Sequence, residues 1–418
     1  MSITGSMLVA SGAMAAYGNS LAVTGDNIAN LNTVGYRESR YTFADLMPTF
    51  DGSIETGDGV RLADVTKPFQ QGGFETTSNS MDLAISGNGF FVVRNPLSNT
   101  LYYTRAGEFH LDNAGRMVNE ADLILQGSAG DIVIANGLTA PAQATSNLSL
   151  QLNLDASSAI PGTALPVGPD APANSWFTAS NFSSTTTIYD SLGNAHDLTF
   201  LYRLSAPNTW EYRALAPRNQ LDSSAPTSTE LRQVSAPGTL GFTAAGQLDS
   251  GASTLTDITG LNWTDGTSQT ITAANLSFAG TVQFAQPSTV FATTQNGMIA
   301  GTFTELTIDD QGNVNGNFSN GTSQVLGVVA LANFNNVDDL DPAGDTLLSP
   351  TVESGVALTG VANQNGLGGL VGGTLELSTV DLAKQFVALI SSQRAFQVNS
   401  RVVTTADQMY VTAAQLKA

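Results

Sequence analysis

Histidine is the side chain best suited to acid–base chemistry near neutral pH, and this chain contains two, His110 and His196. His196 precedes Asp197 at the start of a predicted strand, so the two could be considered as a catalytic pair. A hydrolase also needs a nucleophile, and the G-x-S-x-G motif that presents a serine on a sharp turn does not occur. We therefore interpret His196 as a surface turn residue. His110, between Phe109 and Leu111, is expected on the solvent face of a strand.

One segment of the chain has the composition of a metal-binding loop. Residues 309–315, Asp-Asp-Gln-Gly-Asn-Val-Asn, have the composition of a calcium loop, but their spacing misses the EF-hand pattern and the closing Glu is lacking. We predict a hairpin turn there. Neither G-x-G-x-x-G nor a Walker A motif occurs, and the chain has no Cys for metal binding, disulfides or nucleophilic chemistry. We therefore predict no catalytic residue, no cofactor and no metal site, and expect that the chain is not an enzyme.

The chain is acidic, and its charge is unevenly distributed. Of its 418 residues 42% are hydrophobic and only 12% are charged, about half the usual share of charge. The formal net charge is −20; residues 1–36 contribute −1 and residues 379–418 contribute +2, so the segment between them carries −21. An acidic, self-repelling body argues against binding to nucleic acid or to anionic lipid. The nearly uncharged ends are suited to burial in an interface.

The first thirty residues have the heptad period of a helix that packs against a partner. Two rows of residues recur every seven positions, namely Met7, Met14, Leu21 and Ile28, and Ala10, Tyr17, Thr24 and Leu31. Glycines interrupt the segment at positions 5, 12, 18 and 25, and each costs about 1 kcal/mol relative to Ala in a helix. Such a helix is marginal on its own, so it needs a partner.

The C-terminal end has the same period. Its seven-residue row consists of Leu375, Leu382, Leu389, Phe396, Val403 and Tyr410, and Phe386 and Ile390 widen the apolar stripe. Neither Pro nor Gly occurs from residue 374 to 418, which predicts a helix of about 35–40 residues and about 55 Å. The two helices could pack on their own body. Their position at the extreme ends of the chain favours pairing with each other and with neighbouring copies.

Between the helices the chain reads as a mostly β, multi-domain body. Residues 90–93 form a buried apolar run, and Leu198, Phe200, Tyr202 and Leu204 alternate as in a half-buried strand. Because both ends are helical, we predict nested, discontinuous domains. Residues 1–31 with 374–418 form a coiled-coil helical domain, 32–75 a connecting segment, 76–150 with 293–373 a middle β domain, and 151–292 an outer inserted β domain.

The N-terminal segment does not have the pattern of a secretory signal peptide, because no basic residue precedes Arg37. Its apolar runs are interrupted by Gly12, Gly18 and Gly25, so we predict no membrane insertion. If the protein is exported, we expect export without cleavage of a signal peptide.

Four segments of the chain resemble the axial proteins of the bacterial flagellar rod and hook. They are residues 25–37, residues 87–93, residues 103–109, and residues 375–382 followed by 393–397. The family motif residues carried by the two terminal segments are Asn27, Ile28, Ala29, Asn30, Gly35, Tyr36, Asp381, Gln393 and Arg394. Thr379 stands where the family usually has Asn, and residues 120–122 replace a Gly-containing turn.

Three features favour the hook members of this family over the rod members. The rod proteins are much shorter. Residues 185–204, with Tyr-Asp-Ser-Leu-Gly-Asn inside them, resemble the outer domain of hook proteins, and residues 317–321 and 331–334 are also hook-like. The resemblance implies an extracellular structural subunit that self-assembles into a flexible helical tube, a universal joint that transmits torque from motor and rod to filament. The implied partners are further copies of the chain, the rod, hook-cap and hook–filament junction proteins, and the type III export apparatus.

The terminal helices are the expected site of assembly. We predict an assembly core consisting of Met7, Met14, Tyr17, Leu21, Ile28, Leu382, Phe386, Leu389, Phe396 and Val403. A non-closing interface between copies yields a filament rather than a ring. Two alternative functions remain at this point. One is a distal rod subunit, which would be stiff, and the other is a non-flagellar β-rich surface protein with helical ends.

Overall fold

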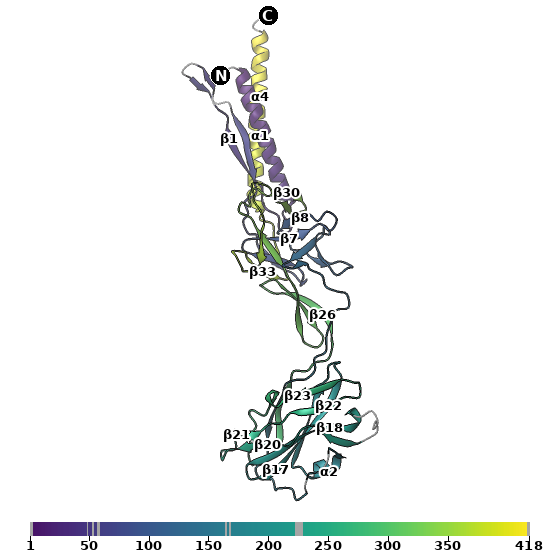
Figure 1. Ribbon diagram of the computed structural model, residues 1–418. Helices are drawn as coiled ribbons and strands as arrows, with labels where there is room; N and C mark the ends of the chain where they lie inside the picture. The colour runs from purple at the N-terminus through teal and green to yellow at the C-terminus, as the bar shows by residue number, and fades with distance from the viewer. Residues whose placement is uncertain are drawn as a thin grey trace. The chain divides into compact units, whose positions relative to one another are not determined.

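The computed structural model of the protein describes residues 3–47, 49–51, 54–56, 59–163, 165–166, 169–221 and 229–415 (Figure 1). The chain divides into two compact units. Unit 1 contains residues 1–136, 305–317 and 323–418, and unit 2 contains residues 137–304 and 318–322. The second unit is thus inserted into the first, as nested domains require. The finer division into three domains and a connecting segment remains a prediction.

Unit 1 contains two long helices and many short strands. Its elements up to residue 136 are α1 (Ile3–Ala29), β1 (Arg40–Asp45), β2 (Thr49–Asp51), β3 (Ile54–Thr56), β4 (Val60–Thr66), β5 (Phe74–Thr76), β6 (Leu83–Ser86), β7 (Phe90–Arg94), β8 (Leu101–Thr104), β9 (His110–Leu111), β10 (Met117–Val118), β11 (Ile124–Gly127) and β12 (Gly130–Asp131). Those after the insertion are β28 (Ser323–Val328), β29 (Ala330–Asn333), β30 (Asp341–Gly344), β31 (Leu347–Ser349), β32 (Leu358–Val361), β33 (Gly369–Gly372), β34 (Thr374–Glu376) and α4 (Leu382–Gln415).

Unit 2 is almost entirely β. Its elements are β13 (Thr139–Ala140), β14 (Leu148–Asn153), β15 (Asp170–Pro172), α2 (Ala173–Thr178), β16 (Phe182–Tyr189), β17 (Ala195–Ala206), β18 (Thr209–Pro217), α3 (Arg218–Leu221), β19 (Glu230–Gln233), β20 (Gly238–Phe242), β21 (Leu248–Thr254), β22 (Ile258–Asn262), β23 (Ser268–Ile271), the 3-10 helix η1 (Ala273–Asn275), β24 (Leu276–Ser277) and β25 (Thr289–Gln295). The strands β26 (Gly301–Ile308) and β27 (Asn313–Phe318) carry the chain between the units.

The two long helices lie side by side and antiparallel in unit 1 (Figure 1). The predicted C-terminal helix is confirmed, but it begins at Leu382, whereas Leu375 lies in strand β34, paired with β5. The seven-residue spacing of Leu375 from the later row is therefore not helical. Asp381 caps the helix, because its Oδ1 accepts hydrogen bonds from the backbone N–H groups of Ala383 at 3.0 Å and Lys384 at 3.2 Å.

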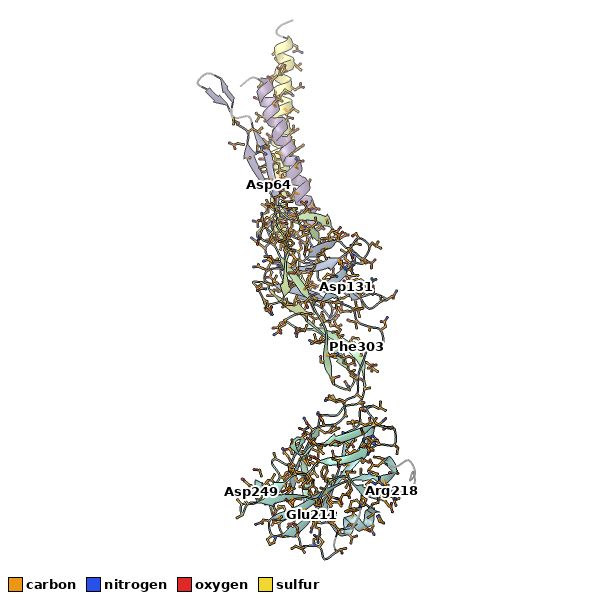
Figure 2. The ribbon with its side chains drawn as sticks, viewed as in Figure 1. Asp64, Asp131, Glu211, Arg218, Asp249 and Phe303 are labelled. Carbon is orange, nitrogen blue, oxygen red and sulfur yellow. The ribbon has the colours of Figure 1, made fainter. Side chains whose placement is uncertain are left out.

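The main sheet of unit 1 contains the apolar run of residues 90–93 that the sequence analysis identified. Its strand order is β30-β31-β8-β7-β11-β10-β9, and β7 also pairs with β29. Residues 90–93 of β7 are all buried, as predicted. Phe90 packs against Phe69 and Phe334, with ring centroids 5.5 and 6.2 Å apart. Arg94 of β7 forms an ion pair with Asp131 of β12, and Asp131 is labelled in Figure 2.

The main sheet of unit 2 has the strand order β15-β19-β18-β17-β16, and β20 and β21 extend it from β18. Leu198, Phe200, Tyr202 and Leu204 of β17 are buried, as predicted. The strand is not half-buried, however, because its other face is covered too. There Leu201 packs in a second cluster with Trp176 of α2. The short helix that covers this face consists of residues 173–178. The pattern of residues within β17 gives no sign of it, so the sequence did not predict this cover.

Among the described residues, no helix is long and apolar enough to cross a membrane.

Candidate assembly site on the terminal helices

The contact between α1 and α4 within one chain is made by small and polar side chains. Ser20 Oγ donates to Ser392 Oγ at 3.1 Å, and Asn27 Nδ2 donates to Gln385 Oε1 at 3.3 Å. Seven residues separate the two bonds along each helix, which fixes an antiparallel register. Ala10, Ala13, Ala16 and Thr24 of α1 and Ala406 of α4 are also buried. Small side chains bury little apolar area, at about 25 cal/mol per Å², so the seam stabilises the helix pair only modestly.

The large residues of the predicted assembly core are only partly buried in the single chain. On α1, Met7, Met14, Tyr17, Leu21 and Ile28 are half-buried. On α4, Leu389 and Val403 are half-buried, whereas Leu382, Phe386 and Phe396 are 38%, 47% and 40% exposed. The single chain therefore leaves part of these apolar rows uncovered. Their role as an assembly core remains a prediction.

The family motif after α1 forms a hydrogen-bonded turn. Asn30 Nδ2 donates to Asp26 Oδ1 at 3.1 Å, and Thr33 Oγ1 donates to Asn30 Oδ1 at 3.1 Å. Tyr36 donates its hydroxyl hydrogen to Asp26 Oδ2 at 2.9 Å. Burial, together with the negative charge of Asp26, raises the pKa of Tyr36 to about 12. Gly35 has a φ of +69°, which only Gly adopts without strain, and its N–H donates to the carbonyl of Glu376 at 2.8 Å.

A buried ionic cluster joins this turn to the strand that precedes α4. Glu376 has a fully buried side chain, and it pairs with Arg37 at 2.8 Å and with Arg105 at 3.1 Å. The N–H of Gly72 donates to the same carboxylate at 2.8 Å. Burial and the neighbouring Arg37 lower the pKa of Arg105, while Glu376 opposes that shift. Four distant segments thus meet at one carboxylate.

Sequence reasoning did not single out this cluster. Arg37, Arg105 and Glu376 all lie in the segments that resemble the family, but Arg37 and Glu376 are 339 positions apart. No local period connects them. The signal that the sequence offers is Glu376, a charged residue between Leu375 and Leu377 in a segment that resembles the family.

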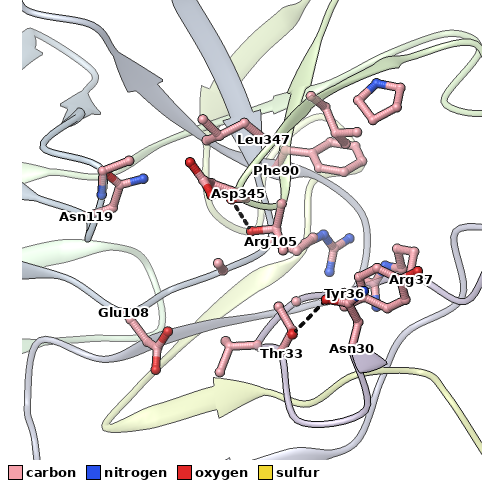
Figure 3. A pocket seen from close by; sticks show the side chains of 18 of the residues that line it. Asn30, Thr33, Tyr36, Arg37, Phe90, Arg105, Glu108, Asn119, Asp345 and Leu347 are labelled. Carbon is pink, nitrogen blue, oxygen red and sulfur yellow. Dashed lines mark hydrogen bonds between the residues drawn. The ribbon is translucent and has the colours of Figure 1, made fainter. Parts of the chain in front are cut away.

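A cleft of about 570 Å³ lies beside the turn, lined in part by the motif residues Asn30, Gly35 and Tyr36. Figure 3 shows Thr33, Arg105, Glu108 and Asp345 among the side chains around it. Burial, and then the neighbouring carboxylates Glu120 and Asp82, raise the pKa of Glu108. The cleft therefore contains charges of both signs next to the family motif.

The motif residues on α4 do not join this cluster. Gln393 and Arg394 are exposed on the helix surface, as is Ala29 at the end of α1. Thr379, the departure from the family pattern, still makes a structural contact, because its Oγ1 accepts the N–H of Glu38 at 2.8 Å.

The residues examined for chemistry lie apart from this site. His110 is exposed on β9, as predicted. His196 is not a surface residue, since it is only 8% exposed, and its side chain contacts Asp190 rather than its sequence neighbour Asp197. The two neighbours point to opposite faces because side chains alternate along β17. Residues 309–313 form the predicted turn, in which Asp309 Oδ1 accepts the N–H groups of Gln311 and Asn313 at 3.0 and 2.9 Å.

Comparison with known proteins decides the family. Four family models match: "Flagella basal body rod protein" over residues 7–37, "Flagellar hook protein FlgE/F/G D1 domain" over 84–152, "Flagellar basal body protein FlaE D2 domain" over 153–298, and "Flagellar basal body rod FlgEFG protein C-terminal" over 371–416. The flagellar hook protein FlgE of Salmonella typhimurium is 36% identical over 414 residues, 95% of this chain and 96% of that protein. The chain belongs to the flagellar hook protein family.

Other members of the family are similar over comparable lengths. The flagellar hook protein FlgE of Escherichia coli is 36% identical over 95% of this chain and 96% of its own length. That of Rhizobium meliloti is 30% identical over the whole of both chains. The resemblance stated from the terminal and interior segments is confirmed, and so is the mostly β fold with helical ends.

Proposed function

We propose that this chain is the structural subunit of the flagellar hook, and that it assembles through α1 and α4 into a helical tube. The observation that carries this proposal is the apolar surface that the single chain leaves uncovered on α4. Phe386, Val387 and Ile390 are 47%, 69% and 48% exposed within little more than one helical turn. Further along the helix, Val398 is 60% exposed and Met409 is 55% exposed. Exposed apolar patches of this kind mark interaction surfaces.

The contact between α1 and α4 within one chain and the exposed heptad rows consist of different residue types, which supports assembly through the terminal helices. The seam that closes α1 on α4 contains Ala, Ser, Asn and Gln, which hold a register but bury little apolar area. The large side chains of the heptad rows remain available for further copies. We therefore keep Met7, Met14, Leu21, Leu382 and Phe396 in the proposed assembly core, with the other residues of the two rows.

The remaining parts of the proposal follow from the family. The β domains of the middle and outer body would make weaker contacts with neighbouring copies, so that the tube bends and transmits torque as a universal joint. The rod, hook-cap and hook–filament junction proteins and the export apparatus would be its partners in the flagellum. We propose a structural role without catalysis. The distal rod subunit, which the motif residues alone do not separate from the hook, is not favoured, because the relatives that match nearly the whole chain are hook proteins.

Electron microscopy of the full chain under polymerising conditions tests the proposal. A double variant, Phe386→Ser with Ile390→Ser, removes apolar surface without touching the seam. Its matched control, Lys384→Gln with Ser391→Ala, changes exposed polar residues on the same turns. We expect curved tubes from the parent and the control, and monomers with unchanged helical circular dichroism from the double variant.

Each other outcome has a definite meaning. Straight, rigid tubes from the parent would favour the rod alternative. Tubes from the double variant as abundant as those from the parent would contradict the assembly surface proposed on α4.

A further inference from the structure

Three side chains from two separate turns of unit 2 converge on one point. Asp190 directly follows the strand β16 and His196 is the second residue of β17, while Asp265 lies in the turn between β22 and β23. One ligand atom of each residue lies within 4.8 Å of those of the other two. The proximity of Asp190 to Asp265 was not predicted from the sequence.

The geometry of the cluster is fixed from several sides. The His196 ring stacks on Trp263, with centroids 3.7 Å apart and planes 5° apart, and its Nε2 lies 3.0 Å from Asp190 Oδ2. Asn194 Nδ2 donates to Oδ2 of Asp190 at 3.1 Å and to Oδ2 of Asp265 at 2.8 Å. One amide group therefore holds the two carboxylates towards each other. Asp190 is fully buried and Asp265 is exposed, so the cluster is open on one side.

The charges of this cluster are not balanced by a permanent cation. Among the ion pairs that the structure describes, neither carboxylate has a Lys or Arg partner; Asp190 pairs with His196 alone. Two carboxylates held this close repel each other unless a positive charge lies between them. An imidazole nitrogen with two carboxylate oxygens is a ligand set that suits borderline divalent metals, of which Zn²⁺ is the commonest example.

We propose that Asp190, His196 and Asp265 form a binding site for a divalent transition-metal ion of the Zn²⁺ class. His196 would bind through Nε2 and carry its hydrogen on Nδ1, and each aspartate would contribute one oxygen. Water would complete the coordination on the open side next to Asp265. The bound ion would link the β16–β17 turn to the β22–β23 turn and so stiffen this end of unit 2. This inference is independent of the proposed function.

The fluorescence of the full chain provides a direct readout. All three Trp residues, Trp176, Trp210 and Trp263, lie in unit 2, and Trp263 stacks on the proposed ligand. The chelator-treated chain is titrated with ZnCl₂ by calorimetry, and thermal unfolding is followed by Trp fluorescence. We expect one equivalent of Zn²⁺ to bind and the fluorescence transition to move to higher temperature with rising Zn²⁺.

Three variants assign the ligands. Asp265→Asn, at an exposed position, should weaken Zn²⁺ binding at least tenfold without changing the apo unfolding temperature by more than a few degrees. His196→Gln should abolish binding. His110→Gln, which removes the exposed histidine of unit 1, should leave binding unchanged.

Several results would overturn the proposal. These are no saturable Zn²⁺ binding, full binding in Asp265→Asn, or loss of binding in His110→Gln. Should His196→Gln fail to fold, Asp265→Asn alone decides the matter. Ca²⁺ serves as a second probe: binding of Ca²⁺ as strong as that of Zn²⁺ would show that carboxylates alone bind the ion, and would exclude His196 as a ligand.

Discussion

Asn27 and Ser39 exchange two hydrogen bonds across the turn that follows α1. Asn27 Nδ2 donates to the Ser39 carbonyl at 2.8 Å, and the Ser39 N–H donates to Asn27 Oδ1 at 2.8 Å. The side-chain amide thus links the last turn of α1 to the segment that enters β1. The same Nδ2 also reaches Gln385 on α4. One motif residue therefore joins both helices to the body of unit 1.

Replacing Asn27 with Ala should destabilise the helix pair. The substitution leaves the buried N–H and C=O groups of Ser39 without partners, which costs about 1–3 kcal/mol. Urea unfolding followed by circular dichroism at 222 nm measures the loss, because the two long helices lie in unit 1. Asn19→Ala is the matched control, since Asn19 is exposed on the same helix. Equal stability of the two variants would contradict the role assigned to Asn27.

Replacing Glu376 with Gln should be more damaging. The substitution removes the single carboxylate that pairs with both Arg37 and Arg105, and so leaves two buried guanidinium groups uncompensated. Breaking a buried ion pair by removing one partner costs about 3–5 kcal/mol. The same urea experiment measures the effect, with the exposed Glu353→Gln as control. A loss below 1 kcal/mol would mean that water already reaches this cluster.

The helices, the buried strands and the turns could be predicted from the sequence because each is set by local spacing. The seven-residue rows, the alternation in β17 and the turn at residues 309–313 are each set by the spacing of residues along one continuous segment. The family motif residues were equally visible. These features depend on backbone geometry that a short segment determines by itself.

The seam between α1 and α4 could not be predicted in the same way. Heptad analysis favours large apolar residues, so it selected Phe386 and Phe396 for the assembly core. Within one chain, however, α1 and α4 are joined by the hydrogen bond between Ser20 and Ser392. A sequence cannot tell which of two stripes on a helix faces its own partner and which faces another copy. The cluster around Glu376 was missed for a related reason, because its members come from distant segments.

The pKa of Asp190 predicts how unit 2 responds to acid. Burial alone would raise this pKa, but a hydrogen on the neighbouring Asp265 carboxyl group and hydrogen bonds with His196 and Asn194 outweigh burial and hold the pKa below its ordinary value. A carboxylate with a lowered pKa in the folded state contributes stability above its unfolded pKa, about 3.9, and loses it as pH falls through the folded pKa. Unit 2 should therefore lose stability as the pH falls below about 4.

Guanidinium unfolding followed by Trp fluorescence at pH 6, 5, 4 and 3 checks this expectation. In Asp190→Asn, stability at pH 6 should be lower than in the parent, and the further loss below pH 4 should be shallower. The control is Asp197→Asn, because Asp197 is exposed on the opposite face of β17. A parent and an Asp190→Asn variant with parallel pH profiles would show that Asp190 does not produce the acid response.

Two glycine substitutions in the N-terminal motif should have opposite effects on the same helix pair. A Cβ at Gly25, inside α1, would meet no atom within 4 Å, so Gly25→Ala should stabilise the helix by about 1 kcal/mol. At Gly35, with its φ of +69°, a Cβ would lie 2.6 Å from the backbone nitrogen of Ala106. Gly35→Ala should therefore destabilise the turn by about 2 kcal/mol or more, from backbone strain and the clash together. Thermal melts at 222 nm compare the two variants with the parent. Melting shifts of the same sign would show that Gly35 is not held in the left-handed conformation that anchors α1 to the strand preceding α4.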